Sequence, residues 1–240
     1  VKDTLRNILP LIEIRTHEAW LKKFHELYDI EYEEVIKDQI HVNGNGLTMA
    51  ETIIKLNELT GGEAVIVTDV GQHQMVACRY SKFNNSRSKV TSGGLGTMGF
   101  ALPAAIGAKM GAPEREVIAI MGDGGLQMNI QELGTVLQTG VPVKVVVLNN
   151  QFLGMVRQWQ ELFFESRYAS TVMTNPDFVK IADGYGIQSK RVTERKDLES
   201  AMKEMVESKN SYFLEVVVEM EENVFPMIPS GASVSDIRLK

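Results

Sequence analysis

The sequence predicts an α/β fold: a mostly parallel sheet with helices on both faces. Short apolar runs bounded by turn-forming residues recur along residues 47–222, as is typical of buried strands. Amphipathic or small-residue-rich segments of helical length separate these runs. Strands that alternate with helices usually pair in parallel, because each crossover helix returns the chain to the same end of the sheet.

The expected elements follow one another at regular intervals. Thr48 and Glu51 have the spacing of a capping box, which predicts a helix that ends at Gly61-Gly62. Asn175 is expected to cap a later helix, with Pro176 in its first turn. The other elements are predicted from apolar periodicity: strands over 64–69, 117–121, 143–148, 187–192 and 212–218, and helices over 97–110, 126–139, 176–185 and 197–208.

Three segments are predicted along the chain. Residues 1–46 are charged and partly helical, with Thr16 as a plausible cap, and are expected to be a connector and the end of an upstream middle domain. They end in the turn formers of 43–46. Residues 47–222 are expected to form the α/β domain, and 223–240 a C-terminal arm. Trp20, Phe24 and Leu27 have the spacing of one helix face, and this apolar face is expected to pack against a hydrophobic partner.

Composition excludes several classes of protein. The net charge is −6 and no long basic run occurs, so nucleic acid is not an expected partner. No apolar run reaches the length of about 18 residues that a membrane helix needs. The single cysteine, Cys78, excludes an internal disulfide framework and indicates a reducing compartment, so a cytoplasmic location is expected. Cys78 itself is expected to be a small buried residue.

A glycine-rich turn and an asparagine pair stand at the ends of two successive strands. Asp123 lies between glycines after the strand 117–121, and Asn149-Asn150 follow the strand 143–148. Because both strands end at one edge of the sheet, Asp123 and Asn150 are expected to be neighbours. Carboxylate, amide and carbonyl oxygens suit Mg²⁺, which completes its shell with phosphates and water. Each half alone is also explained by an ordinary turn.

The same stretch resembles the thiamin diphosphate signature, in which GDG is followed after 24 residues by NN. Three further stretches narrow the resemblance: VGQHQM at 70–75, TSGGLGTMGFALPAAIGA at 91–108 and GMVRQWQ at 154–160. Together they are similar to the large, catalytic subunit of acetolactate synthase, from about residue 48 to residue 230. The chain corresponds to the C-terminal, cofactor-binding third of that subunit.

The resemblance implies a transferase that condenses two 2-keto acids with loss of carbon dioxide, in branched-chain amino acid biosynthesis. Pyruvate reacts with a second pyruvate or with 2-ketobutyrate. The implied cofactors are thiamin diphosphate and Mg²⁺, with FAD in a domain that lies outside this chain. The implied partners are further copies of the subunit, as a homodimer or homotetramer, and a small regulatory subunit. The essential glutamate belongs to an absent domain, so the chain alone is expected to be inactive or nearly so.

The resemblance also implies roles for individual residues. Mg²⁺ would be bound by Asp123, Asn150 and the carbonyl of Phe152, and Trp159 would select the second keto acid. The C-terminal arm would cover the site. Contacts to thiamin diphosphate are implied for sixteen residues: Val70, Gly71, Gln72, His73, Gly96, Met98, Gly122, Asp123, Gly124, Gly125, Met128, Asn150, Phe152, Leu153, Gly154 and Met155.

Other interpretations of the same residues stay open. His73 fits a loop anchor, the methionines fit core gap-fillers, and Trp159 fits ordinary packing on an amphipathic helix. Alternative functions are another thiamin diphosphate enzyme (a keto-acid decarboxylase, pyruvate oxidase or glyoxylate carboligase) and a non-catalytic binding module. A nicotinamide-binding domain is not favoured, because no predicted strand leads into a G-x-G-x-x-G turn that opens a helix.

Overall fold

The computed structural model describes residues 1–40, 44 and 46–240, which form two compact units. The larger unit, Gln39–Phe225, contains the sheet, and the smaller unit combines Val1–Asp38 with Pro226–Lys240. The turn predicted at 43–46 lies partly outside the described residues. The predicted domain boundaries stay predictions.

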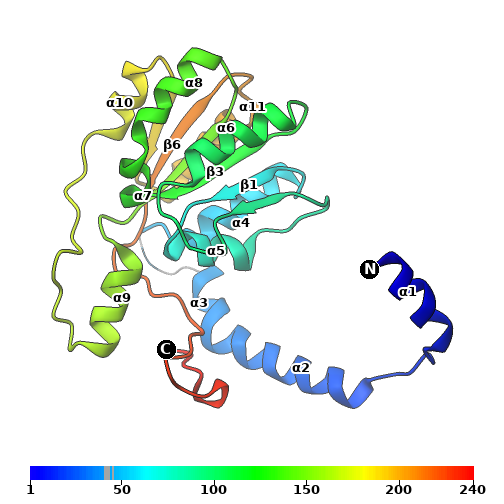
Figure 1. Ribbon diagram of the computed structural model, residues 1–240. Helices are drawn as coiled ribbons and strands as arrows, with labels where there is room; N and C mark the ends of the chain where they lie inside the picture. The colour runs from blue at the N-terminus through cyan, green and yellow to red at the C-terminus, as the bar shows by residue number, and fades with distance from the viewer. Residues whose placement is uncertain (41–43, 45) are drawn as a thin grey trace. The chain divides into compact units, whose positions relative to one another are not determined.

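The larger unit is built on a six-stranded sheet in which all strands are parallel, in the order β2-β1-β3-β4-β6-β5 (Figure 1). This confirms the predicted fold class, and all five predicted strands are present. The strands are β1 (Val65–Thr68), β2 (Lys89–Thr91), β3 (Val117–Gly122), β4 (Lys144–Asn149), β5 (Gln188–Val192) and β6 (Tyr212–Val217).

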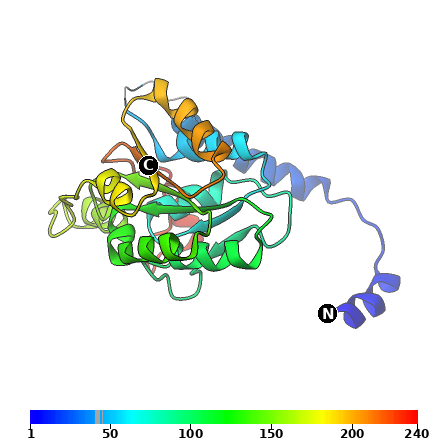
Figure 2. The ribbon, with the colours of Figure 1, turned by 90° about the horizontal axis from the view of Figure 1, so that it is seen from above.

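Helices cover both faces of this sheet, as the view from above shows (Figure 2). One face packs against α4 (Met49–Thr60), α5 (Gln72–Tyr80) and α11 (Arg195–Glu207). The other packs against α6 (Ala101–Gly111), α7 (Asp123–Met128), α8 (Leu133–Thr139) and α10 (Phe178–Gly184). The larger unit also contains α9 (Gly154–Phe163) and the short 3₁₀ helix η3 (Ile130–Glu132).

The two faces carry separate hydrophobic clusters, because side chains alternate along each strand. On β3, Ile118 and Ile120 belong to the α4 side, whereas Val117, Ala119 and Met121 belong to the α6 side. All five are 0 % exposed. The central strands are therefore apolar on both faces, which is typical of a parallel sheet with helices on each side.

The predicted capping box at the start of α4 is confirmed. Thr48 Oγ1 accepts a hydrogen bond from Glu51 N at 3.1 Å, and Thr48 N donates to Glu51 Oε2 at 3.3 Å. At its other end the helix stops at Gly61, whose φ of +58° is the left-handed conformation that favours glycine.

Two predicted helices have different bounds because single residues leave the helical conformation. The helix expected over 97–110 begins only at Ala101, since Gly99 has φ +82°. The helix expected over 126–139 is divided into α7, η3 and α8. The division falls at Asn129, whose φ of −138° is not helical and whose Nδ2 donates to Gly99 O at 2.7 Å. One contact between two distant segments thus accounts for both differences.

The expectation of a buried Cys78 is wrong, because this residue lies on the outer side of a helix that was not predicted. The stretch that contains it, Gln72–Tyr80, is the helix α5, and its inward positions include Val76 and Ala77. Cys78 is exposed, and its Sγ accepts a hydrogen bond from Lys89 Nζ at 2.7 Å. Strand β2, which includes Lys89, is also additional to the predicted elements.

The smaller unit is mainly helical. It contains α1 (Lys2–Ile8), the 3₁₀ helix η1 (Leu9–Leu11), α2 (Glu18–Glu31), the π-helix η2 (Tyr32–Ile36), the start of α3 (Lys37–Ile40) and the 3₁₀ helix η4 (Val234–Asp236). Thr16 is not the cap of α2, because the helix begins one residue later and its N-cap is His17. Trp20 and Phe24 pack edge to face on α2 and stay 62 % and 40 % exposed.

Across the described part of the chain, no helix combines the length and the apolar character that crossing a bilayer requires.

Candidate functional site

The turns that follow β1, β3 and β4 meet at the carboxyl edge of the sheet and enclose a cavity of about 80 Å³. Of the sixteen residues implied as cofactor contacts, all but Gly96 and Met128 line this cavity. Three further residues line it without having been predicted: Met49, Leu148 and Val156. The convergence follows from topology, because adjacent parallel strands deliver their end loops to one place.

Asp123 is the carboxylate of this cavity. It is 1 % exposed and opens α7 directly after β3. Oδ1 accepts from Gly124 N at 3.0 Å, and Oδ2 accepts from Asn175 Nδ2 at 2.7 Å. Burial raises the pKa of Asp123, while the hydrogen bonds from Asn175 and the backbone oppose that rise. The donors that hold the carboxylate are neutral amides, so an added cation would relieve its desolvation.

The two adjacent asparagines point in opposite directions, as successive residues at the end of a strand do. Asn150 lines the cavity, where its Oδ1 accepts from Phe152 N at 3.3 Å and its Nδ2 donates to Gln72 Oε1 at 3.4 Å. Asn149 is absent from the cavity lining. Its Nδ2 donates instead to Glu215 Oε1 at 2.7 Å. Asn150 therefore belongs to the site, and Asn149 to the support behind it.

Asp123, Asn150 and Phe152, the three residues predicted to bind the cation, all line this cavity. Among the described residues, no group of three His, Cys, Asp or Glu side chains could hold a metal ion. The cavity offers one carboxylate with amide and carbonyl oxygens. That set suits a hard divalent cation whose remaining ligands come from phosphate and water.

His73 and Gln72 reach the cavity from the first turn of α5, and both are buried. Gln72 Nε2 donates to Gln158 Oε1 at 3.0 Å and to Glu222 O at 2.8 Å. His73 Nε2 has no hydrogen-bond partner in the described structure. A buried nitrogen without a partner is costly, and water or a ligand group can supply the missing hydrogen bond. Burial lowers the pKa of His73 to about 4, so the ring is neutral at pH 7.

This depressed pKa predicts a pH window for stability. The unfolded chain protonates His73 near pH 6.5, whereas the folded chain does so only near pH 4. Stability from this group is therefore complete above pH 6.5 and is lost as the pH falls towards 4, by about 3 kcal/mol in total. We expect urea unfolding of His73→Gln to show a shallower fall than wild type between these values.

The difference between wild type and His73→Gln isolates the contribution of His73 to the pH dependence of stability. The other titrating groups are present in both proteins, so their contributions cancel. Burial raises the pKa of Asp69, Asp123, Glu116 and Glu222, which gives an opposite pH trend in wild type and variant alike. Parallel stability curves for His73→Gln and wild type would show that His73 is not the source.

Two glycines stand where neighbouring groups already occupy the space that a side chain would need. A Cβ on Gly154 would overlap Gln72 Oε1 and lie 3.0 Å from Asn150 Nδ2. A Cβ on Gly124 would lie 2.7 Å from Leu153 Cδ2. The absence of side chains at these positions lets backbone and cavity-lining groups approach closely.

The implied residues outside the cavity are Gly96, Met128 and Trp159. Gly96 closes a turn with φ +62°, and its N–H donates to Ser92 O at 3.0 Å. Met128 is 53 % exposed. Trp159 packs on α9 against Phe163, with ring centroids 4.8 Å apart. The functional roles of these three residues stay predictions. For Trp159 the structure shows packing against Phe163 on the same helix.

Sequence reasoning missed Asp69, which is fully buried after β1. Its Oδ2 accepts from Gly99 N at 3.1 Å, and its Oδ1 accepts from Ala101 N at 3.3 Å. Asp69 therefore caps α6 from another segment and holds the loop that contains Met98. An acidic residue directly after a buried apolar strand was the only available signal.

The predicted cap role of Asn175 is wrong. The N-cap of α10 is Asp177, whose side chain accepts from Lys180 N. Asn175 instead donates to Asp123 and to Asn149, because the chain before Pro176 turns back towards the site. The helix starts after Pro176 because Asp177, which Arg191 Nη2 contacts at 2.7 Å, supplies the cap instead.

Comparisons with known proteins agree with this geometry. Residues 69–216 match the family described as thiamine pyrophosphate enzyme, C-terminal TPP binding domain. The acetolactate synthase isozyme 2 large subunit of Escherichia coli is 46% identical over 184 residues, which are 76% of this chain and 34% of that protein. The acetolactate synthase large subunit of Lactococcus lactis is 42% identical over 236 residues, 96% of this chain and 40% of that protein.

A solved structure shares the fold. The thiamine diphosphate-dependent 4-hydroxybenzoylformate decarboxylase of Rhodococcus jostii superposes with a TM-score of 0.69 and 26% sequence identity, over 75% of this chain and 34% of the other. The chain thus spans between a third and two fifths of the length of the relatives described here.

Proposed function

Because the chain belongs to the thiamine pyrophosphate enzymes, through their C-terminal TPP-binding domain, we propose that it forms the cofactor-binding part of an acetolactate synthase large subunit. The whole protein would condense two 2-keto acids with loss of carbon dioxide. The observation that carries the proposal is the meeting of Asp123, Asn150 and the unpartnered His73 Nε2 in one cavity. Identities of 46% and 42% to acetolactate synthases support this activity over that of the more distant decarboxylase.

The residues present fit thiamin diphosphate with Mg²⁺. The buried nitrogen of His73 lacks a partner in the described structure, and Gly122, Gly124, Gly125 and Gly154 line the cavity without side chains. In the proposal, Asp123, Asn150 and the carbonyl of Phe152 bind the cation. Gln72, His73 and the amides of Gly124 and Gly125 bind the diphosphate. Because Gly124 N–H already donates to Asp123 Oδ1, phosphate binding by this amide requires that bond to open.

The bound cofactor would supply the electron sink for cleavage and formation of bonds at the keto carbon. The chain's own task is to orient it. Met98 lines the cavity and would support the two rings of the cofactor, with the loop that carries it held by Asp69. Trp159 would contact the second keto acid.

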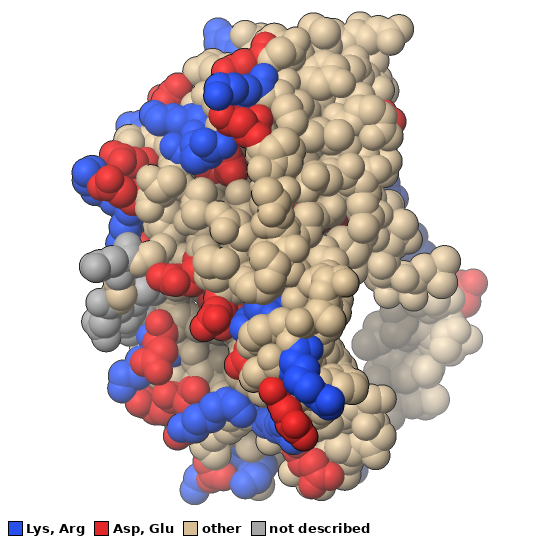
Figure 3. Space-filling view, turned by 90° about the vertical axis from the view of Figure 1, so that its left-hand side faces the viewer, with Lys and Arg blue, Asp and Glu red and all other residues tan. Residues whose placement is uncertain are grey.

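The exposed apolar surface of the larger unit supports assembly with a second subunit. Several large apolar side chains are exposed: Val156 of the cavity lining at 48 %, Val172 at 67 % and Leu95 at 95 %. The face in Figure 3 carries a broad area without charged side chains. Such a surface is typical of an interface, which supports assembly with a second subunit. A small regulatory subunit, FAD binding in a further domain and a cytoplasmic location are parts of the same proposal.

Product analysis tests the activity. The full-length protein, supplied with thiamin diphosphate, Mg²⁺, FAD and pyruvate, is expected to form 2-acetolactate. An aldehyde, acetyl phosphate or tartronate semialdehyde as the main product, the last with glyoxylate as substrate, would assign the chain to another enzyme of the family.

A further inference from the structure

Asn175 contacts the predicted cation ligand from a segment far along the chain. We propose that Asn175 is a positioning residue, which holds the Asp123 carboxylate in the orientation that binds the divalent cation. This inference rests on the proposed function. The contact is direct: Asn175 Nδ2 donates to Asp123 Oδ2 at 2.7 Å, across 52 residues of sequence.

The amide of Asn175 has a single chemically consistent orientation. A carboxylate only accepts hydrogen bonds, so the NH₂ group must face Asp123. The same NH₂ group donates to Asn149 Oδ1 at 3.0 Å, and the carbonyl oxygen accepts from Gln127 Nε2 at 2.9 Å. Donors and acceptors of this side chain are all matched, which fixes its plane.

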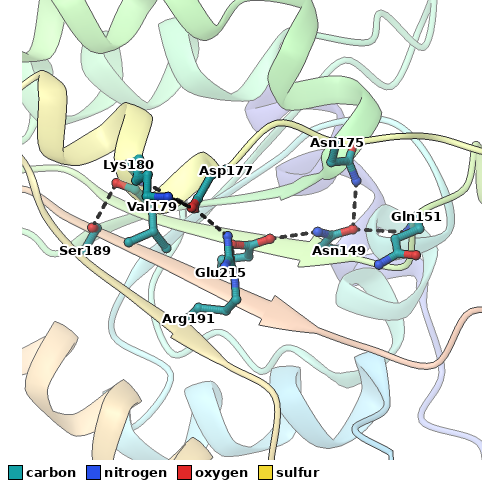
Figure 4. Close-up of polar contacts among 9 residues, drawn as sticks. All are labelled: Asn149, Gln151, Asn175, Asp177, Val179, Lys180, Ser189, Arg191 and Glu215. Atoms are coloured by element: carbon teal, nitrogen blue, oxygen red, sulfur yellow. Dashed lines mark hydrogen bonds and ion pairs between the residues drawn. The ribbon is translucent and has the colours of Figure 1, made fainter.

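The hydrogen bonds of Asn175 continue away from the cavity, through Asn149 to Glu215. Asn149 Oδ1 accepts from Asn175 and from Gln151 N, so its Nδ2 is left to donate to Glu215 (Figure 4). Glu215, which is 2 % exposed, in turn accepts from Arg191 Nε at 2.6 Å. Each amide therefore points its donor at a group that can only accept, and a flip of either one would oppose like groups.

The segment that carries Asn175 is anchored at two points. Arg191 also donates to Asp177 Oδ1 at 2.7 Å, and Asp177 caps α10. Asn175 and Asp177 flank Pro176, whose ring restricts the backbone between them. The tripeptide is thus tied to the cation site at one end and to strand β5 at the other.

This arrangement leaves Asp123 ready for a cation. Each carboxylate oxygen accepts one hydrogen bond, from Gly124 or from Asn175, and keeps further lone-pair capacity for a metal. Loss of the Asn175 donor frees the carboxylate to rotate. Removing a group that orients a metal ligand typically weakens metal binding by about 10–100-fold.

The test measures the Mg²⁺ requirement of cofactor binding rather than activity. Calorimetry with the full-length protein follows thiamin diphosphate binding during Mg²⁺ titration. We expect Asn175→Ala to raise the Mg²⁺ concentration at half-saturation by about tenfold or more. Asn175→Gln keeps an amide donor and is expected to recover part of the loss. Gln127→Leu removes only the side chain that donates to Asn175 Oδ1, so it is expected to give a smaller rise in the Mg²⁺ concentration at half-saturation. This variant tests the same inference if Asn175→Ala does not fold.

Asp177→Ala is the matched control from the same tripeptide. It removes the α10 cap and the second anchor but not the donor to Asp123, so it is expected to lower the Tm and to raise the Mg²⁺ requirement clearly less than Asn175→Ala does. An equal rise for Asp177→Ala and Asn175→Ala would assign the effect to the loop as a whole and overturn the inference. So would an unchanged requirement for Asn175→Ala beside Mg²⁺-dependent binding by wild type. Absence of Mg²⁺-dependent binding in wild type would overturn the proposed function itself.

Discussion

Asp123→Ala is expected to abolish Mg²⁺-dependent binding of thiamin diphosphate and to lower acetolactate formation by the full-length protein about 10³-fold or more. Asp123 is the only carboxylate among the three proposed cation ligands, and it lines the cavity at 1 % exposure. A metal ion that neutralises phosphate charge contributes several kcal/mol, and about 1.4 kcal/mol corresponds to a tenfold change in rate. Calorimetry and a steady-state assay measure the two effects.

Asp123→Asn separates loss of the ligand charge from loss of the fold. Burial raises the pKa of Asp123, so the ionised form is disfavoured by folding at neutral pH. A neutral amide of the same shape removes that cost but accepts only one of the two hydrogen bonds from Gly124 and Asn175. We expect a metal-free Tm close to that of wild type together with lost cofactor binding. Full activity of either Asp123 variant would refute the cation site.

Arg191→Leu is expected to destabilise the protein by about 2 kcal/mol, because it leaves the buried Glu215 without its charged partner, while the 39 % exposure of the Arg191 side chain lets solvent screen part of the ion pair. Glu215 is 2 % exposed on the central strand β6, and Arg191 on the neighbouring β5 lies 2.6 Å from it. Without Arg191 the buried carboxylate keeps only the Asn149 amide as a side-chain donor. Urea unfolding at pH 7 measures the loss.

The double variant Glu215→Gln with Arg191→Leu tests whether the charge is the cause. The Gln side chain can still accept from Asn149 Nδ2, and no buried charge is left without a partner. We expect the double variant to recover about half of the stability lost in Arg191→Leu, which is about 1 kcal/mol. Equal destabilisation in the single and double variants would attribute the effect to the packing of Arg191 or to its contact with Asp177 instead.

The sheet was predictable because its signals are local. Val65–Thr68, Val117–Gly122 and Lys144–Asn149 are apolar runs next to turn formers, and burial on both faces requires that composition. The cavity was predictable for a related reason. Once the strands are parallel, their carboxyl ends lie together, so Asp123 and Asn150 meet without any knowledge of side-chain packing.

The predictions for Asn129 and Asn175 are wrong because each side chain forms a hydrogen bond with a residue far away in sequence. Asn129 leaves its helix to donate to Gly99, 30 residues away. Asn175 has the local signature of a cap but donates to Asp123. Cys78 lies on the outer side of α5, a helix that the sequence did not predict.

The sequence by itself determined the parallel α/β fold, the family resemblance and the position of the turns that enclose the cavity, because periodicity and motif spacing act over short range. Only the tertiary structure decided how the site is supported: Asp69 on the loop of Gly99, and Asn175 with Asn149 and Glu215 behind Asp123. Buried polar groups must find hydrogen-bond partners wherever the fold places them, and those partners come from segments that no local pattern connects.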